Sequence, residues 1–69
     1  MIDWQLLTSL LKGAGLTQKE INRATGVSVS TIAHLSAGSM PEPRFSDGVK
    51  LVDCAYDVLK PEQFARIRQ

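Results

Sequence analysis

Residues 17–38, which read TQKEINRATGVSVSTIAHLSAG, decide the fold of this chain. Thr17 and Glu20 match the capping box T-x-x-E, in which each side chain bonds a backbone amide at the start of a helix. Gly26 suits a tight turn between two helices, because glycine adopts a positive φ at little cost. The stretch therefore predicts a short helix that begins near Gln18 and ends in a turn at Gly26.

A second helix follows the turn. Ser28 or Ser30 is suited to its N-cap, and Gly38 is suited to its C-terminal end. Ile32 and Leu35 are three positions apart, so they lie on one face and form its buried pair. The residues expected to hold the two helices together are Ile21, Ala24, Val27, Ile32 and Leu35.

The residues before this stretch predict another helix. Asp3 is a good N-cap, and Ile2 can pack on Leu7 as a hydrophobic staple. Apolar residues then recur at helical spacing, and the helix is expected to stop at Gly13. This stripe comprises Trp4, Leu7, Leu10 and Leu11, and Trp4 is expected in the core.

The residues after it predict two more helices. Residues 39–43 contain two prolines and form a loop, after which Ser46 or Asp47 caps a helix that runs to about Leu59. Its expected apolar face comprises Phe45, Val49, Val52, Tyr56 and Leu59, widened by Leu51, Ala55 and Val58, opposite Asp47, Lys50, Cys54 and Asp57. Pro61 opens a last short helix with Phe64 and Ile67, which either close the core or form a dimer patch.

No run alternates with period two over a useful length, so the fold class is all-α, a compact five-helix bundle forming a single domain over residues 1–69. A domain this small buries only about 60% of its unfolded surface, so a partner subunit would add stability. The longest apolar run is too short to cross a bilayer, and the first residues do not resemble a secretory signal. We therefore expect a cytoplasmic protein.

Catalytic and metal chemistry have little support in the composition. The chain has one cysteine and one histidine, which excludes an intrachain disulfide and a Cys-rich zinc site. It has no glycine-rich phosphate loop and no set of residues typical of a catalytic triad. We expect neither an enzyme nor a cofactor, a metal or a small-molecule substrate.

The net charge by itself does not indicate a nucleic-acid-binding protein. Eight Lys and Arg against seven Asp and Glu give a net charge of +1. The small basic surplus lies in residues 1–38, where Lys12, Lys19 and Arg23 face only Asp3 and Glu20. A role in DNA binding must therefore rest on where residues lie.

The arrangement resembles the helix-turn-helix domains of the lambdoid phage repressors and Cro proteins, and the bacterial regulators that share their five-helix fold. The resemblance covers about residues 4–59. Its motifs are Leu16-Thr17-Gln18-x-Glu20-Ile21, the turn Gly26-Val27-Ser28, Ser30-Thr31-Ile32-x-x-Leu35 followed by Gly38, and Pro43-Arg44-Phe45. It implies a transcriptional regulator, a Cro-like repressor of phage or prophage type that binds operator DNA and acts in the bacterial nucleoid.

The sequence departs from that family at four positions. Asn22 stands where a small Ala is usual, and Thr25 stands where Leu is usual. Pro41 and Glu42 replace residues that are often basic, so we expect weaker contact of this loop with the DNA backbone. The family places the residue that corresponds to Arg44 over the minor groove.

A helix in the major groove reads bases with the side chains near its exposed start. Here those residues are Ser28, Val29, Ser30, Ala33 and His34. Serine hydroxyls donate or accept, valine packs on a thymine methyl, and His34 can donate to a guanine acceptor. Because no Arg or Lys is among them, we expect modest specificity or a reliance on DNA shape.

Phosphate contacts would hold that helix in register. The residues expected to make them are Thr17, Gln18 and Lys19 at a helix start, with Ser39 and Arg44 on the far side. Few charges are available, so a monomer would bind only weakly. We therefore expect a homodimer on an inverted repeat, with half-sites about 34 Å apart.

Plainer roles remain open for several of these residues. Ser28 could serve only as a cap, His34 could be a solvated surface residue, and Arg44 could pair with Glu42. Cys54 is either a dimer contact or a partly buried spectator thiol. Residues 17–38 could also form an ordinary helical hairpin, or a helix-turn-helix domain used for protein contacts, as in an antitoxin or anti-repressor.

Overall fold

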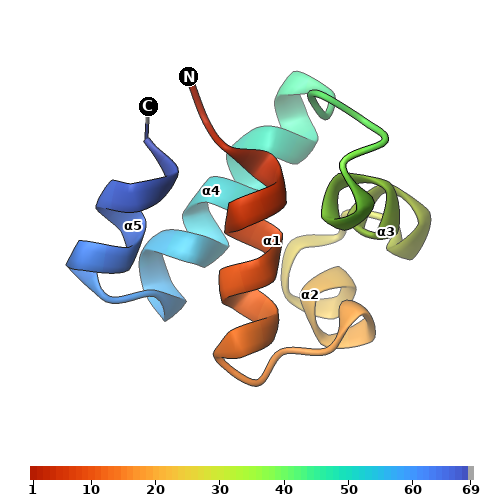
Figure 1. Cartoon of the computed structure of the whole chain (residues 1–69). Coiled ribbons are helices and arrows are strands. Elements are labelled where there is room, and N and C mark those ends of the chain that lie inside the picture. The colour runs from red at the N-terminus through yellow and green to blue at the C-terminus, as the bar shows by residue number, and fades with distance from the viewer. Residues whose placement is uncertain (69) are drawn as a thin grey trace.

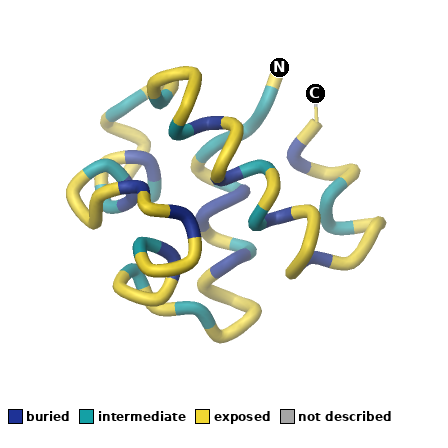
Figure 2. Tube along the Cα trace, turned by 180° about the vertical axis from the view of Figure 1, so that it is seen from behind, coloured by how far each residue is buried: buried dark blue, intermediate teal, exposed yellow. Residues whose placement is uncertain are grey.

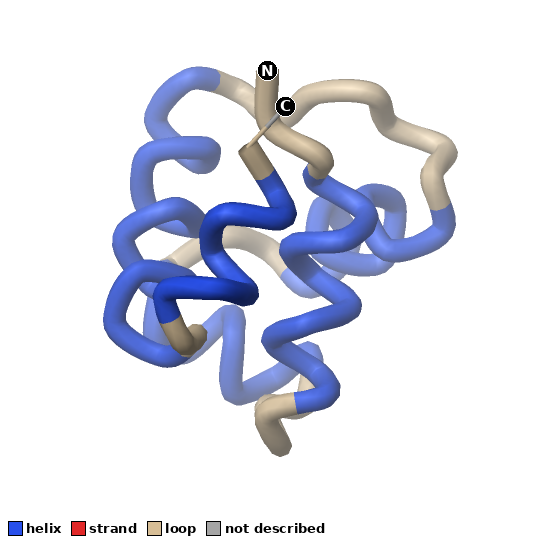
Figure 3. The backbone as a smooth tube through the Cα atoms, turned by 60° about the vertical axis from the view of Figure 1, so that its left-hand side comes forward, coloured by secondary structure: helices blue, strands red, loops and turns tan. Residues whose placement is uncertain are grey.

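Five helices make up most of the chain in the computed structural model, which describes residues 1–68, and these residues contain no strand (Figures 1 and 3). The helices are α1 (Trp4–Gly13), α2 (Gln18–Thr25), α3 (Val29–Ala37), α4 (Phe45–Val58) and α5 (Pro61–Ile67). The predicted all-α class with five helices is thus confirmed.

The first three helices begin at the side chains that the sequence marks as caps. Asp3 accepts a hydrogen bond from an amide of the first turn of α1 at 3.0 Å. The capping box is complete, since Thr17 Oγ1 accepts from the Glu20 N–H at 3.1 Å and a Glu20 carboxylate oxygen accepts from the Thr17 N–H at 2.9 Å. At α3 the cap is Ser28, whose hydroxyl accepts from the Thr31 N–H at 3.2 Å.

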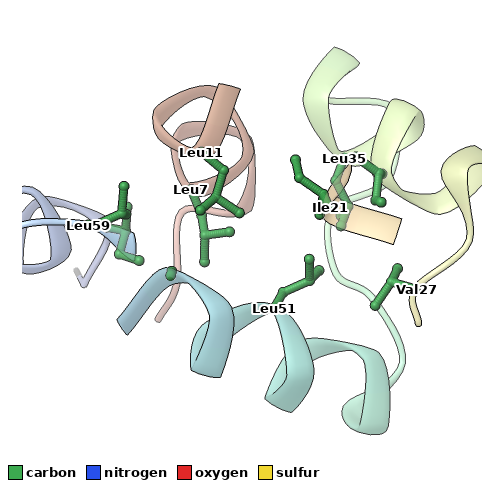
Figure 4. Packing of buried hydrophobic residues seen from close by; sticks show 10 residues of the cluster. Leu7, Leu11, Ile21, Val27, Leu35, Leu51 and Leu59 are labelled. Carbon is green, nitrogen blue, oxygen red and sulfur yellow. The ribbon is translucent and has the colours of Figure 1, made fainter. Parts of the chain in front are cut away.

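Helix α1 is the centre of the molecule. It contacts α3, α4 and α5, and in Figure 1 it passes between α5 on one side and the α2 and α3 pair on the other. The buried hydrophobic core, most of which is labelled in Figure 4, draws on every helix. Its members are Leu7, Leu11, Ile21, Val27, Ile32, Leu35, Leu51, Ala55, Leu59 and Ile67. Figure 2 shows exposed positions on the outer turns around this centre.

Helix α4 starts earlier than the sequence predicts, because Arg44 is its N-cap and neither Ser46 nor Asp47 caps it. The Gly48 N–H donates to the Arg44 carbonyl at 2.8 Å, so the first turn is already helical there. Gly48 is buried, and an added Cβ would lie 3.1 Å from the Trp4 ring. Packing against α1 thus sets the start of α4 without a side-chain cap.

The predicted apolar face of α4 is right for Leu51, Ala55 and Leu59, which are buried, and wrong for its aromatic residues. Phe45 is 88% exposed and Tyr56 is 75% exposed, although both were expected in the core. The buried positions of α4 are Gly48, Leu51 and Ala55, with Val52 and Cys54 half-buried beside them and Val49 and Val58 exposed. Gly48 allows close approach to Trp4 of α1, so the helix turns Gly48, Leu51 and Ala55 inward and leaves Phe45 and Tyr56 outside.

Two further core assignments change. Trp4 is half-buried and packs on the edge of the core, where it covers Gly48. Ala24 is exposed, because α2 buries Ile21 and Thr25, four positions apart, as its inward pair. Cys54, expected on the polar side of α4, packs against the core instead.

The two ends of the chain meet beside α5. Ile67 is fully buried and Phe64 is half-buried, so α5 closes the core. The Asp3 N–H donates to the Ile67 carbonyl at 2.8 Å, and Ile2 and Arg68 form an antiparallel bridge. Figures 1 and 3 accordingly show the N-terminal segment beside the end of α5.

Side-chain hydrogen bonds lock the turn between α2 and α3. Thr25 Oγ1 donates to the Ile21 carbonyl at 2.7 Å and accepts from the Val27 N–H at 3.1 Å. Asn22 Nδ2 donates to the Val27 carbonyl at 2.7 Å, and Gly26 takes the left-handed conformation with φ 78°. Asn22 and Thr25 are thus the residues that form hydrogen bonds with the Val27 carbonyl and the Val27 N–H. Both differ from the residues usual in the resembling family.

We expect the variant Thr25→Val to lower the free energy of unfolding by about 1–3 kcal/mol, because it removes the acceptor of the buried Val27 N–H. The matched control is Thr8→Val. Thr8 is also buried, but its hydroxyl only donates, to the Trp4 and Gln5 carbonyls of its own helix. Urea unfolding of both variants measures the difference, and equal losses would contradict the role given to Thr25.

Candidate nucleic-acid interface

Helix α3 buries one side and presents the other to solvent. Ile32 and Leu35 are fully buried. Of the residues predicted to read bases, Ser28, Val29, Ser30 and His34 are exposed and Ala33 is half-buried. These five residues, which we call the α3 face, lie on the outward side of the helix, from its N-cap at Ser28 to His34.

The Ser28 hydroxyl is largely occupied by the helix itself. In addition to capping the Thr31 amide, it donates its proton to Thr31 Oγ1 at 3.0 Å. Ser28 can therefore offer a ligand only an acceptor position. Thr31 accepts this bond and keeps its own hydroxyl proton to donate. Thr31 is the polar group that the sequence interpretation missed, and its position three residues after a serine cap was the available signal.

His34 and Ser39 lie against each other at the C-terminal end of α3, although the sequence suggested separate roles for them. The distance from His34 Nδ1 to Ser39 Oγ is 3.1 Å. Ser39 also donates its backbone N–H to the His34 carbonyl at 3.0 Å and its hydroxyl to the same carbonyl at 3.2 Å. Both side chains are exposed, so Ser39 extends the exposed polar surface beyond His34, the last residue of the α3 face.

The start of α2 offers a weak site for an anion. Thr17 and Lys19 are exposed and Gln18 is half-buried. The positive end of a helix attracts phosphate, but here the Glu20 carboxylate already occupies the Thr17 amide. Hydrogen bonds from Thr17 lower the pKa of Glu20, with a smaller contribution from Arg23, so this carboxylate is charged at neutral pH.

Arg44 lies at the N-cap of α4 and is exposed, as are Pro41 and Glu42 in the loop before it. An exposed arginine at the end of a loop can reach a phosphate or a groove edge with its long side chain. The family resemblance places the corresponding residue over the minor groove, so Arg44 stays a predicted contact.

Cys54 lines a hollow between α2 and α4, together with Thr25, Lys50 and Asp57. Partial burial and the neighbouring Asp57 raise the pKa of its thiol, which keeps the thiol protonated and poorly nucleophilic. Its packing against the core therefore favours the spectator role over the dimer contact. Within residues 1–68, no three His, Cys, Asp or Glu side chains are grouped so as to hold a metal ion.

Comparison of the chain with protein-family models, with curated proteins and with solved structures found no match. The described helices include none that is both long and apolar enough to cross a membrane. The functional argument therefore rests on the residues and their geometry.

The Glu20 bonds make the capping box sensitive to pH. Because the folded pKa of Glu20 lies below its ordinary 4.5, the carboxylate stabilises the fold above that pH, and this stabilisation is lost as the pH falls through the folded value. We expect the variant Thr17→Ala to lose about 1 kcal/mol of stability at pH 7. In this variant the Glu20 pKa, followed by NMR titration, should rise only part of the way toward its ordinary value, because alanine keeps the backbone N–H that is the larger cause of the shift and removes only the hydroxyl. An unchanged Glu20 pKa would contradict a contribution from the Thr17 hydroxyl.

Proposed function

We propose that this protein is a sequence-specific DNA-binding transcriptional regulator, a Cro-like repressor that acts as a homodimer on an inverted-repeat operator. The observation that carries the proposal is the α3 face, a polar strip on a short helix whose other side is anchored in the core. The locked turn at Gly26 keeps α2 and α3 at one angle. A fixed, protruding helix is what entry into the major groove requires.

In the proposed complex, the α3 face meets base edges and α2 lies across the backbone. Val29 is 39% exposed at the first position of α3, where its methyl groups can pack on a thymine methyl. Ser30 and Thr31 supply hydroxyl groups beside it. Exclusion of RNA polymerase from an occupied promoter would then give repression.

Affinity is the weak point of a single copy. Lys19 and Arg23 of α2 and Arg44 before α4 are exposed cations, and α3 itself carries no Lys or Arg. Because neutralised phosphates supply most of the affinity of nonspecific binding, one copy should bind DNA only in the range of about 10⁻⁴ to 10⁻⁶ M. Two copies on two half-sites would provide the missing affinity.

An exposed apolar face on α4 and α5 is the proposed dimer surface. Two hollows of 510 and 780 Å³ share Ile2 and Val52, and Phe45 lines one while Tyr56 lines the other. The Tyr56 ring packs edge-on against Phe64, with their centroids 5.7 Å apart. We call this the α4 outer face.

A second copy of the chain fits this face by charge and by area. Glu42, Arg44 and Asp53 line one hollow and Arg68 lines the other. A twofold arrangement can therefore place the Arg68 of each copy opposite the carboxylates of the other. The exposed Phe45 and Tyr56 rings offer roughly 300 Å² at about 150–250 Å² for each aromatic side chain. Neighbouring side chains must supply the remainder of the roughly 800 Å² per partner that stable interfaces bury.

Phe45→Ser should therefore weaken self-association while leaving the fold intact, since Phe45 is 88% exposed. Val58→Ser is the matched control, because Val58 is also partly exposed on α4 but lines the hollow beside Cys54 instead. Sedimentation equilibrium should give at least a tenfold higher dimer dissociation constant for Phe45→Ser than for the control. The same constant for both would remove Phe45 from the interface.

Selection of bound sequences from a random duplex pool tests the proposed function directly, and we expect an enriched inverted repeat. Arg44→Ala should then weaken binding and reduce the slope of log K against log salt by about one. Lys60→Ala, which removes an exposed charge at the start of α5, should leave the slope unchanged. A folded protein that enriches no sequence would overturn the DNA-binding proposal.

The second candidate function is a helix-turn-helix domain that contacts a protein, as in an antitoxin or anti-repressor. The net charge of +1 and the uncharged α3 favour it, because neither is typical of a surface selected for phosphate. The two functions differ in salt dependence. Apolar protein contacts are nearly indifferent to salt, whereas DNA binding through phosphates weakens steeply as salt rises.

A further inference from the structure

The α4 outer face contains an apolar stripe that the rest of the chain leaves largely uncovered. The stripe consists of Phe45, Val49, Val52 and Tyr56. Successive members are four, three and four positions apart, so all four lie on one side of the helix. Val52 is half-buried, and the other three are exposed. This spacing is typical of the contact positions between two helices that pack side by side.

The stripe is symmetric about its own midpoint. Read in either direction along α4, the intervals between its members are four, three and four positions. When two copies of α4 lie antiparallel about this midpoint, Phe45 faces the partner's Tyr56, and Val49 faces the partner's Val52. A single register therefore matches the stripe to itself, which a twofold interface requires because both copies use the same surface.

The Tyr56 end of the stripe has room for the partner's Phe45 ring. The hollow of 780 Å³ at this end is lined in part by Tyr56, Phe64 and Ala65, and we call it the Tyr56 hollow. Pockets of about 300–1,000 Å³ hold drug-sized molecules, so this space admits a phenyl ring. The Tyr56 and Phe64 rings meet at 81° with centroids 5.7 Å apart, and a third ring can extend this edge-to-face packing.

The charged side chains favour the antiparallel arrangement over a parallel one. Glu42 and Asp53, together with Arg44, line the hollow of 510 Å³ at the Phe45 end, whereas Arg68 lines the Tyr56 hollow. A parallel pair of α4 helices would bring the Glu42 and Asp53 carboxylates of both copies together. An antiparallel pair brings the partner's Arg68 toward these carboxylates instead, and complementary charge fixes the orientation of an interface.

We propose that this protein dimerises through an antiparallel pair of α4 helices, in which Phe45 of each copy inserts into the Tyr56 hollow of the other. The inference rests on the proposed function, because it defines how the homodimer of that proposal is assembled. Each copy supplies both an inserted ring and a receiving hollow, so the dimer contains the same contact twice.

Mixing two variants tests this reciprocal contact. Phe45→Ser removes the inserted ring, and Ala65→Trp fills the Tyr56 hollow from within its own copy. Both residues are exposed, so circular dichroism should show an intact fold. We expect each variant alone to raise the dimer dissociation constant by about tenfold or more, as loss of an aromatic anchor does.

An equimolar mixture of the two variants should recover dimerisation. In the mixed dimer, Phe45 of the Ala65→Trp copy inserts into the open hollow of the Phe45→Ser copy. At the second contact the missing ring faces the filled hollow, so no clash arises there. Sedimentation equilibrium without DNA should therefore give a higher weight-average mass for the mixture than for either variant alone at the same total concentration.

Ala24→Trp is the matched control for Ala65→Trp, because Ala24 is also an exposed helical alanine but lines the hollow beside Cys54. Equal dimer affinity of these two variants, or a mixture with no gain in mass, would overturn the inserted arrangement. A wild type that stays monomeric would overturn it as well. The DNA-binding proposal fails on a different result, which is a selection from random duplexes that enriches no sequence.

Discussion

The turn between α2 and α3 is the constraint on which the outward surface depends. Thr25 Oγ1 binds the Ile21 carbonyl and the Val27 amide, and Asn22 binds the Val27 carbonyl. Val27 can therefore be buried at the corner with its backbone polar groups satisfied, which a buried turn otherwise makes costly. Because Val27 is fixed, α3 leaves the turn in one direction.

Both ends of α3 are held by side chains whose bonds also limit what they offer a ligand. At the start, the Ser28 hydroxyl donates its proton to Thr31 Oγ1. The Thr31 hydroxyl is therefore the donor that this end can offer to a ligand. At the other end, the Ser39 hydroxyl lies within hydrogen-bond distance of both the His34 carbonyl and His34 Nδ1. The hydrogen bonds that stabilise the helix thus set the donor and acceptor pattern that the α3 face presents.

Local signals in the sequence predicted the helix order and most of the caps, because a capping box or a left-handed glycine involves residues a few positions apart. The faces of α4 were predicted poorly. The apolar stripe that contains Phe45 and Tyr56 is as regular as the one that contains Leu51 and Ala55. Only the close approach of Gly48 to Trp4 selects which stripe turns inward, and that contact joins residues far apart in the chain.

The sequence by itself determined five helices, the position of the turn at Gly26 and the buried pair of α3, because these follow from short-range hydrogen bonding and helical periodicity. The tertiary structure alone decided which side of α4 is exposed and that the side chains of His34 and Ser39 lie against each other. The first depends on how closely two helices can pack. The second depends on the Gly38 turn, which brings Ser39 back to the end of α3.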